Sequence, residues 1–164
     1  MSTIRVAWGT ATGPTEMSSY DAALADANLH NYNLVAVSSM IPADADVEAV
    51  GTVPDLGPAG ERLTVVEARA TRVGPGRASA ALGWTTSEGD DGDSSGPGLF
   101  YEAAGETDPE DVAERVRSGL AAGRELREWE FGDERIETAD VRAESDSYAT
   151  AVVVAVYGES DPIC

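Results

Sequence analysis

The chain of 164 residues has the length of one ordinary domain, and its 42% of hydrophobic residues suffices for a buried core. It carries 30 acidic against 11 basic residues, a net charge of −19, which argues against nucleic acid as a partner because phosphate binding needs basic patches. We find no apolar stretch long enough for a membrane helix and no signal-peptide pattern, and therefore expect a cytoplasmic protein without membrane contact. The single cysteine, Cys164, excludes an internal disulfide, and no Cys/His cluster indicates a metal site.

All basic residues are arginine, and lysine is absent. Two interpretations of the acidic charge compete. It either steers cationic ligands or keeps the surface hydrated in molar salt. At about 1 M salt the Debye length is only ~3 Å, which nearly abolishes long-range steering. Because the lack of lysine fits a general surface replacement better than one focused patch, we favour a halophilic origin.

The first quarter of the chain predicts a strand, a loop, a helix and a second strand. Residues 3–8 are the strand and residues 9–15 the loop. The helix is expected over 18–29, capped by one of its first two serines. The apolar centre of residues 32–39 predicts a strand that is buried on both faces.

The middle of the chain predicts two strands and two irregular segments. Residues 43–60 are rich in alanine, proline and acids, which is typical of a surface connection. Strands are expected over 63–72 and 77–86, and the Gly74-Pro75-Gly76 turn between them indicates a hairpin. Residues 87–97 lack the spacing of a calcium loop and are predicted to be a solvated loop.

The last part of the chain contains the clearest helix signal. After a short strand over 98–104, Asp108-Pro109 supplies a cap residue and a proline at the first helical position. One apolar face recurs at helical spacing, with the members Val112, Val116, Leu120 and Gly123 or Leu126. Residues 134–143 and 149–157 are expected to form a closing antiparallel pair. The whole chain, 1–164, is thus predicted to be one α+β layered domain.

Ser38-Ser39 stands out among three serine pairs because it ends the apolar run and leads into Met40-Ile41-Pro42. A serine hydroxyl at a sharp strand exit is able to attack the carbonyl group just before it. The competing interpretation is a strand end followed by an ordinary turn. The other two pairs are predicted to lie at a helix start, Ser18-Ser19, and in a flexible loop, Ser94-Ser95.

The order and setting of five residues resemble the pyruvoyl-dependent arginine decarboxylase family: Asp21, Asn33, Ser38, Ser39 and Glu102. The resemblance covers most of the chain. Its blocks are the loop 9–15, Tyr20-Asp21, the run from Asn33 to Pro42, Gly98 to Glu102, and the helix that ends in Arg127-Glu128-Trp129-Glu130. The chain departs from the family where Ala103 and Ala104 follow the glutamate, in place of an aromatic residue and a second acid.

The resemblance implies a four-layer αββα sandwich with mostly antiparallel sheets, and a homotrimer, or a dimer of trimers, with sites between subunits. It implies self-cleavage between Ser38 and Ser39 into a β chain, 1–38, and an α chain, 39–164. It also implies decarboxylation of arginine to agmatine and carbon dioxide, an entrance to polyamine synthesis.

The chemistry of the pair supports a specific processing route. If the strand is unbroken, Asn33 and Ser39 share one face, and the Asn33 amide is expected to polarise the Ser38 carbonyl. Ser39 Oγ attacks that carbonyl and the amide becomes an ester. Elimination then frees the Ser38 carboxylate and leaves dehydroalanine, which hydrolyses to a pyruvoyl group. The pyruvoyl ketone takes the part of pyridoxal phosphate, forming a Schiff base with the substrate amine; lysine, which pyridoxal phosphate would need, is absent.

Two carboxylates complete the expected site. As the resemblance implies, Glu102 donates the proton to the α-carbon and Asp21 binds the substrate guanidinium in a bidentate pair. Each has a plainer alternative, a solvated acid for Glu102 and a favourable charge near a helix N-terminus for Asp21. Asn33 at a strand start is also common turn chemistry.

Two other functions remain open from the sequence. One is a pyruvoyl-dependent decarboxylase of another amino acid, such as histidine, because Asp21 indicates a cationic side chain without fixing its length. The other is an unprocessed, non-catalytic subunit that assembles with a partner.

Overall fold

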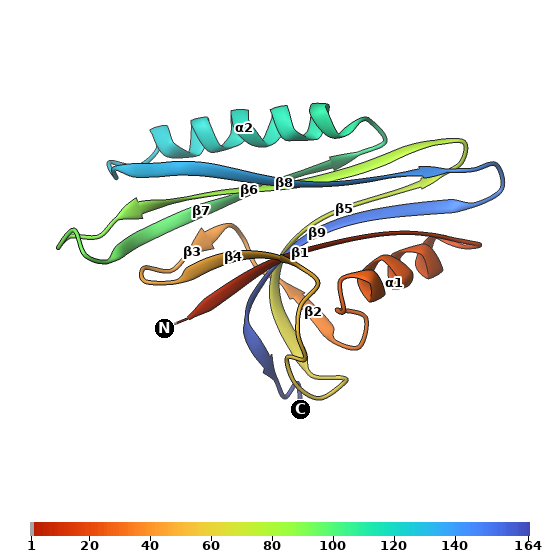
Figure 1. Cartoon of the computed structure of the whole chain (residues 1–164), viewed down its shortest axis with the longest axis horizontal. Helices are drawn as coiled ribbons and strands as arrows, with labels where there is room; N and C mark the ends of the chain where they lie inside the picture. Colours follow the sequence, from red (N-terminus) through yellow and green to blue (C-terminus); the bar gives the residue numbers. More distant parts are fainter. Residues whose placement is uncertain (1) are drawn as a thin grey trace.

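The computed structural model of the chain describes residues 2–164, and these contain two helices and nine strands arranged in two sheets (Figure 1). The elements are β1 (Thr3–Gly13), α1 (Glu16–Asp26), β2 (Asn33–Ala36), β3 (Met40–Ile41), β4 (Asp46–Gly51), β5 (Arg62–Val73), β6 (Gly76–Glu88), β7 (Ser95–Gly105), α2 (Pro109–Glu125), β8 (Phe131–Ala143) and β9 (Tyr148–Asp161). Neither of these two helices has both the length and the apolar character needed to cross a membrane.

The five-stranded sheet has the order β2-β5-β9-β1-β4, and the four-stranded sheet has the order β3-β7-β6-β8. Strand pairs β1–β4 and β2–β5 are parallel, and the other pairs are antiparallel. The predicted α+β class with mostly antiparallel sheets is confirmed.

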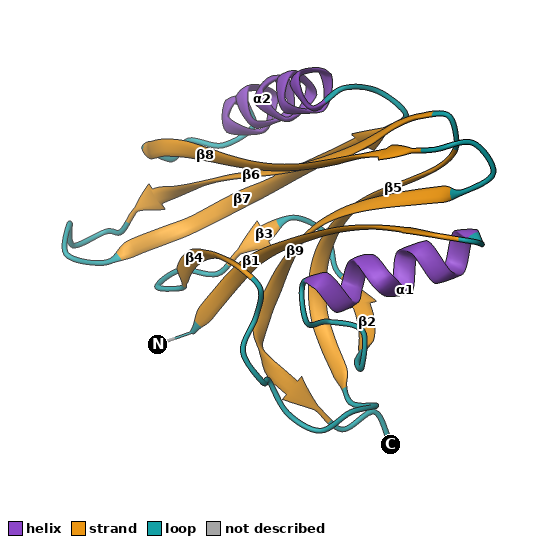
Figure 2. Cartoon of the chain, turned by 45° about the vertical axis from the view of Figure 1, so that its right-hand side comes forward, coloured by secondary structure: helices purple, strands orange, loops and turns teal. Residues whose placement is uncertain are grey.

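The main hydrophobic core lies between the two sheets, where Val66 and Val153 of one sheet pack with Leu82 and Phe100 of the other. Helix α1 covers the outer face of the five-stranded sheet, and α2 lies along the four-stranded sheet (Figure 2). Each strand at the centre of a sheet is therefore covered on both faces, which explains the long buried runs of β6 and β9.

Helix α2 confirms the clearest sequence signal. Asp108 is its N-cap, with Oδ1 accepting from the Asp111 N–H at 2.9 Å, and Pro109 follows at the first helical position. The predicted apolar face is buried as far as Gly123, whereas Leu126 is 79% exposed and lies beyond the helix.

The first helix begins earlier than predicted. Thr15, not Ser18 or Ser19, is the N-cap, and Ser18 takes the third helical position. In this capping box Thr15 Oγ1 accepts from the Ser18 N–H and Ser18 Oγ accepts from the Thr15 N–H, each at 3.0 Å. The predicted loop over 9–15 is also mostly strand, because β1 continues to Gly13 along its partner β9.

Both predicted strand pairings were wrong. Strands β5 and β6 flank the Gly74-Pro75-Gly76 turn, but β5 pairs with β9 and β6 with β7 and β8, so the turn passes from one sheet to the other. Likewise, β8 and β9 belong to different sheets. Turn chemistry predicts a reversal of direction, whereas the choice of partner depends on which strands bury each other's faces.

The prediction of a doubly buried strand over 32–39 was wrong as well. Strand β2 has only four residues, lies at the edge of its sheet, and leaves Val35 42% exposed. The irregular connection predicted over 43–60 contains the short edge strand β4.

Candidate active site

Ser38 and Ser39 form the link between β2, at the edge of the five-stranded sheet, and β3, at the edge of the four-stranded sheet (Figure 1). Neither serine belongs to a strand. Ser38 is exposed and Ser39 is partly buried. The peptide bond that joins them therefore lies where the chain crosses from one sheet to the other.

Hydrogen bonds hold the chain on both sides of this peptide bond. On the β2 side, the Val37 N–H donates to the Val65 carbonyl at 2.9 Å. On the β3 side, the Ser39 carbonyl accepts from the Phe100 N–H at 2.7 Å. Because the two anchors come from different sheets, cleavage between Ser38 and Ser39 would leave both new chain ends in place.

A tyrosine strengthens the second anchor. The Tyr157 hydroxyl donates to the Met40 carbonyl at 2.7 Å, and its ring lies edge-on to Phe100. Burial raises the pKa of Tyr157 to about 12, so the hydroxyl keeps its proton and remains a donor at neutral pH.

Glu102 lies on β7, two residues beyond Phe100, and thus on the same strand that binds the Ser39 carbonyl. Its side chain is exposed to solvent. Burial of its carboxyl raises the pKa of Glu102 above the ordinary value, and the negative charge of Glu67 adds to that rise. A carboxyl with a raised pKa thus lies on the strand that binds the Ser39 carbonyl, two residues from that hydrogen bond.

Asp21 lies on the exposed side of α1. Within residues 2–164 its carboxylate forms no side-chain hydrogen bond and no ion pair. The helix is fixed to the sheet by a chain of hydroxyl groups. Ser19 Oγ lies 2.7 Å from Thr150 Oγ1, which lies 2.8 Å from Thr71 Oγ1. This attachment fixes α1 against the sheet, and the Asp21 carboxylate faces solvent on the other side of the helix.

The Asn33 amide points elsewhere in the intact chain. Its Nδ2 donates to the Gly60 carbonyl at 2.7 Å, in the connection that precedes β5. Strand β2 ends at Ala36, so the unbroken strand that would put Asn33 and Ser39 on one face is not present. In this structure Asn33 therefore fastens β2 to the loop that precedes β5.

Sequence reasoning missed one carboxylate near the link. Glu67 of β5 is partly buried and accepts from the Tyr20 hydroxyl, at 2.9 Å to Oε2 and 3.1 Å to Oε1. A signal was available, because Glu67 continues the alternation of Leu63 and Val65 on a face that is otherwise apolar. A charged residue at such a position is a candidate for a site.

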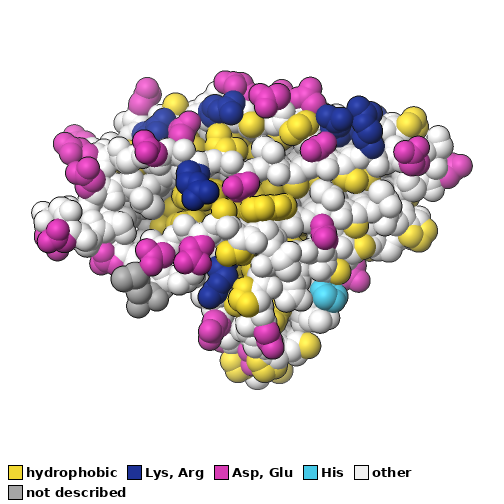
Figure 3. Space-filling model, viewed as in Figure 1, with side chains coloured by type: hydrophobic (Ala, Val, Ile, Leu, Met, Phe, Trp, Pro, Cys, Tyr) yellow, Lys and Arg dark blue, Asp and Glu magenta, His cyan; other side chains and the backbone are white. Residues whose placement is uncertain are grey.

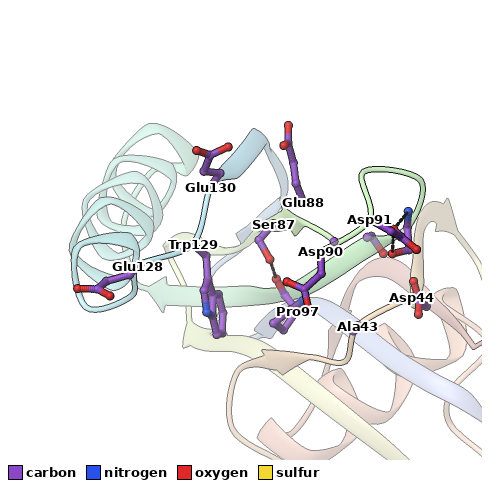
Figure 4. A pocket seen from close by; sticks show the side chains of 14 residues that line it. Ala43, Asp44, Ser87, Glu88, Asp90, Asp91, Pro97, Glu128, Trp129 and Glu130 are labelled. Carbon is purple, nitrogen blue, oxygen red and sulfur yellow. Dashed lines mark hydrogen bonds between the residues drawn. The ribbon is translucent and has the colours of Figure 1, made fainter.

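A separate hollow lies between the β6–β7 loop and the segment after α2, and it contains none of the predicted site residues (Figure 4). Its acidic members are Asp44, Glu88, Asp90, Asp91, Glu128 and Glu130. Trp129 lies against it, and Ser87 Oγ donates to the Pro97 carbonyl at its floor. None of the residues that line this hollow takes part in the chemistry proposed at Ser38 and Ser39.

Comparison with known proteins identifies one consistent family. The sequence model described as "Pyruvoyl-dependent arginine decarboxylase" matches residues 3–162. A protein of that name from Halobacterium salinarum is 56% identical over 163 residues, covering 99% of this chain and 98% of its own. Proteins of the same name from Thermococcus kodakarensis and Methanopyrus kandleri are 34% and 30% identical, covering 90% and 91% of this chain and the same shares of their own.

Proposed function

Because the chain belongs to the pyruvoyl-dependent arginine decarboxylase family, we propose that it converts L-arginine to agmatine and carbon dioxide. The observation that carries the proposal is the 56% identity over 99% of the chain to a protein of that name. The structure supports it with a serine pair at an exposed crossing between two sheets, beside a carboxyl of elevated pKa.

The chain is proposed to cleave itself between Ser38 and Ser39 into a β chain, 1–38, and an α chain, 39–164. Ser39 Oγ attacks the Ser38 carbonyl carbon, and the amide becomes an ester. Loss of the Ser39 α-proton then breaks the Cβ–O bond, which frees the Ser38 carboxylate and leaves dehydroalanine. Hydrolysis of dehydroalanine releases ammonia and leaves a pyruvoyl group before Met40.

The residues around position 39 fit such a group. The flanking segments are held by Val65, Phe100 and Tyr157, so the new end of the α chain stays in place after cleavage. The pyruvoyl group supplies a carbonyl that binds the substrate amine and accepts electrons when carbon dioxide leaves. Glu102, on the strand that binds the Ser39 carbonyl, adds an exposed carboxyl that suits a charged substrate.

We assign the remaining roles to side chains of this chain. Glu102 holds the proton that is delivered to the substrate α-carbon, a role that its raised pKa favours. Asp21 accepts two N–H donors of the substrate guanidinium, because a carboxylate and a guanidinium match in a bidentate pair. Asn33 assists processing, which requires its amide to exchange the Gly60 carbonyl for that of Ser38.

The proposed assembly is a homotrimer of cleaved protomers, or a dimer of trimers, with sites between subunits. Apolar side chains on both sides of the Ser38-Ser39 link are exposed, with Val35, Val37 and Met40 at 42%, 45% and 42%. A neighbouring subunit would cover this strip. We also propose that the two sheets with their outer helices form the family's four-layer αββα sandwich.

The decisive experiment is intact-mass analysis of purified protein with and without hydroxylamine. We expect two fragments, of 38 residues and of 126 residues (164 − 38), with the carbonyl reagent adding only to the larger. Ser39→Ala should remain one inactive chain, because the attacking hydroxyl is gone. Ser38→Ala is the matched control and should still cleave, since Ser38 contributes only its carbonyl group.

Release of carbon dioxide is then compared for arginine, ornithine, lysine and histidine, with arginine expected to be the best substrate. A preparation that decarboxylates arginine while consisting of one intact chain would contradict the proposed cofactor. A preference for histidine would support a decarboxylase of another amino acid.

A further inference from the structure

Three side chains next to the proposed site have no role in the mechanism above: Tyr20 of α1, and Glu67 and Arg69 of β5. We call them the Glu67 cluster. The Tyr20 hydroxyl donates to both Glu67 carboxylate oxygens, and the guanidinium carbon of Arg69 lies 4.2 Å from the centroid of the Tyr20 ring. Arg69 thus packs on the ring in cation–π geometry, and among the ion pairs of residues 2–164 none includes Glu67.

The strand register places the Glu67 cluster beside the Ser38-Ser39 link. Ala36 pairs with Val65 in the parallel ladder of β2 and β5, and the Val37 N–H donates to the Val65 carbonyl. The link therefore starts next to the part of β5 that carries Glu67, two residues beyond Val65. Both side chains lie on the face that α1 covers, the helix that also carries Asp21.

Glu67 lies on β5 of one sheet and Glu102 on β7 of the other, and these two strands bond the chain on either side of the link. Burial raises the pKa of Glu67, while the Tyr20 hydrogen bond and the charge of Arg69 oppose the rise. The Glu67 charge is close enough to disfavour ionisation of Glu102. Two carboxylates, Glu67 and Glu102, thus face one guanidinium, that of Arg69, and the net negative charge that remains is one that a cationic ligand would relieve.

We propose that Glu67 is a specificity-determining residue that accepts N–H donors of the substrate guanidinium together with Asp21, an inference that rests on the proposed function. A guanidinium carries five N–H donors, and a bidentate pair with one carboxylate uses two of them. A second carboxylate satisfies donors that would otherwise be desolvated without a partner. Tyr20 holds the Glu67 carboxylate in place before the ligand arrives, which reduces the entropy lost on binding.

The test compares wild-type protein with Glu67→Gln and with Glu48→Gln, an identical change at an exposed site on β4, the opposite edge strand of the same sheet. Intact mass first establishes processing of each protein. The kcat and KM for arginine are then measured for each protein on its own pH plateau. Calorimetry gives the Kd of agmatine and of carbamoylputrescine, in which a neutral urea group replaces the guanidinium.

Glu67→Gln should process normally, raise the KM for arginine and the Kd of agmatine about tenfold, and leave kcat within about twofold. The affinity for carbamoylputrescine should not change, and Glu48→Gln should match the wild type throughout. Unchanged agmatine affinity would overturn the proposal. An equal loss of affinity for both ligands would also overturn it, because a merely structural role of Glu67 would not distinguish a charged ligand from a neutral one.

Two provisions keep the test decisive. If Glu67→Gln does not accumulate as folded protein, the Tyr20→Phe variant is tested in its place. That variant keeps the Glu67 carboxylate but removes the hydroxyl that holds it. That variant should weaken agmatine binding, and unchanged affinity would again overturn the proposal. Failure of the proposed function shows separately, as a wild-type chain that neither cleaves nor releases carbon dioxide from arginine; a wild type that does not bind agmatine overturns both.

Discussion

Glu67 and Glu102 have raised pKa values in the folded chain, which has consequences for both stability and catalysis. A carboxyl whose pKa is raised by folding contributes stability that is fully present below its unfolded pKa and is lost as the pH rises through its folded pKa. At neutral pH these two carboxylates are therefore a cost to the fold. Both lie on strands that bond the chain beside the Ser38-Ser39 link, where the proposed chemistry requires titratable groups.

Glu102→Gln is predicted to lower kcat by about 10²- to 10⁴-fold, because the amide cannot supply the proton. Agmatine affinity should stay close to that of the wild type. In the wild type, kcat/KM should fall as the pH rises through the raised pKa of Glu102, since the protonated form is required. Loss of the neighbouring charge in Glu67→Gln lowers that pKa and moves the falling limb to lower pH. Steady-state kinetics across pH measure this limb, and an identical position in both proteins would refute the coupling.

Strand β2 leads directly into the Ser38-Ser39 link. It is short, lies at a sheet edge, and exposes apolar side chains, whereas isolated edge strands are usually protected by charge or by a covering element. A neighbouring subunit is the covering element proposed here. The same edge position leaves the chain free to turn after Ala36 and cross to β3, which brings Ser38 and Ser39 between the two sheets.

Val35→Asp should convert the assembly to monomers, because it places a charge in the strip that the neighbouring subunit would cover. Val73→Asp is the matched control, since Val73 is 53% exposed at the far end of β5, away from that strip. Light scattering coupled to gel filtration measures the molar mass. The same mass for Val35→Asp and wild type, both larger than a protomer, would exclude β2 from the interface.

At the scale of the whole molecule, acidic side chains are scattered over the visible face and are not gathered into one patch (Figure 3). The described residues form five side-chain ion pairs, so most of the 30 acids have no arginine partner. This distribution fits a surface adapted to salt better than a field that steers one ligand.

Thermal unfolding should therefore shift to higher temperature as KCl rises from about 0.1 M to about 2 M, because salt screens the mutual repulsion of the acids. Each kcal/mol of added stability raises Tm by roughly 2–4 °C for a domain of this size. We expect the added salt to stabilise the fold by several kcal/mol, so that Tm rises by several times this amount. Differential scanning calorimetry gives the curve, and NaCl at equal ionic strength should reproduce it. A Tm that falls or stays flat would refute the halophilic interpretation.

The sequence by itself determined features that depend on a few neighbouring residues. The Asp108-Pro109 start and apolar face of α2 follow from capping chemistry and helical spacing. Ser38-Ser39 and Glu102 were singled out through short motifs and the resemblance they carry. Most strand positions were also predicted, because alternation and turn residues act locally.

Only the tertiary structure decided which strands pair and which side chains meet. The β5–β6 and β8–β9 neighbours lie in different sheets, and β2 lies at an edge, because burial of whole sheet faces selects partners that are distant along the chain. The same selection brings Tyr20 to Glu67, 47 residues away, and turns the Asn33 amide toward Gly60. Local sequence chemistry thus specified the cap of α2, most strands and the serine pair, whereas Tyr20 and Glu67 became neighbours only through long-range packing.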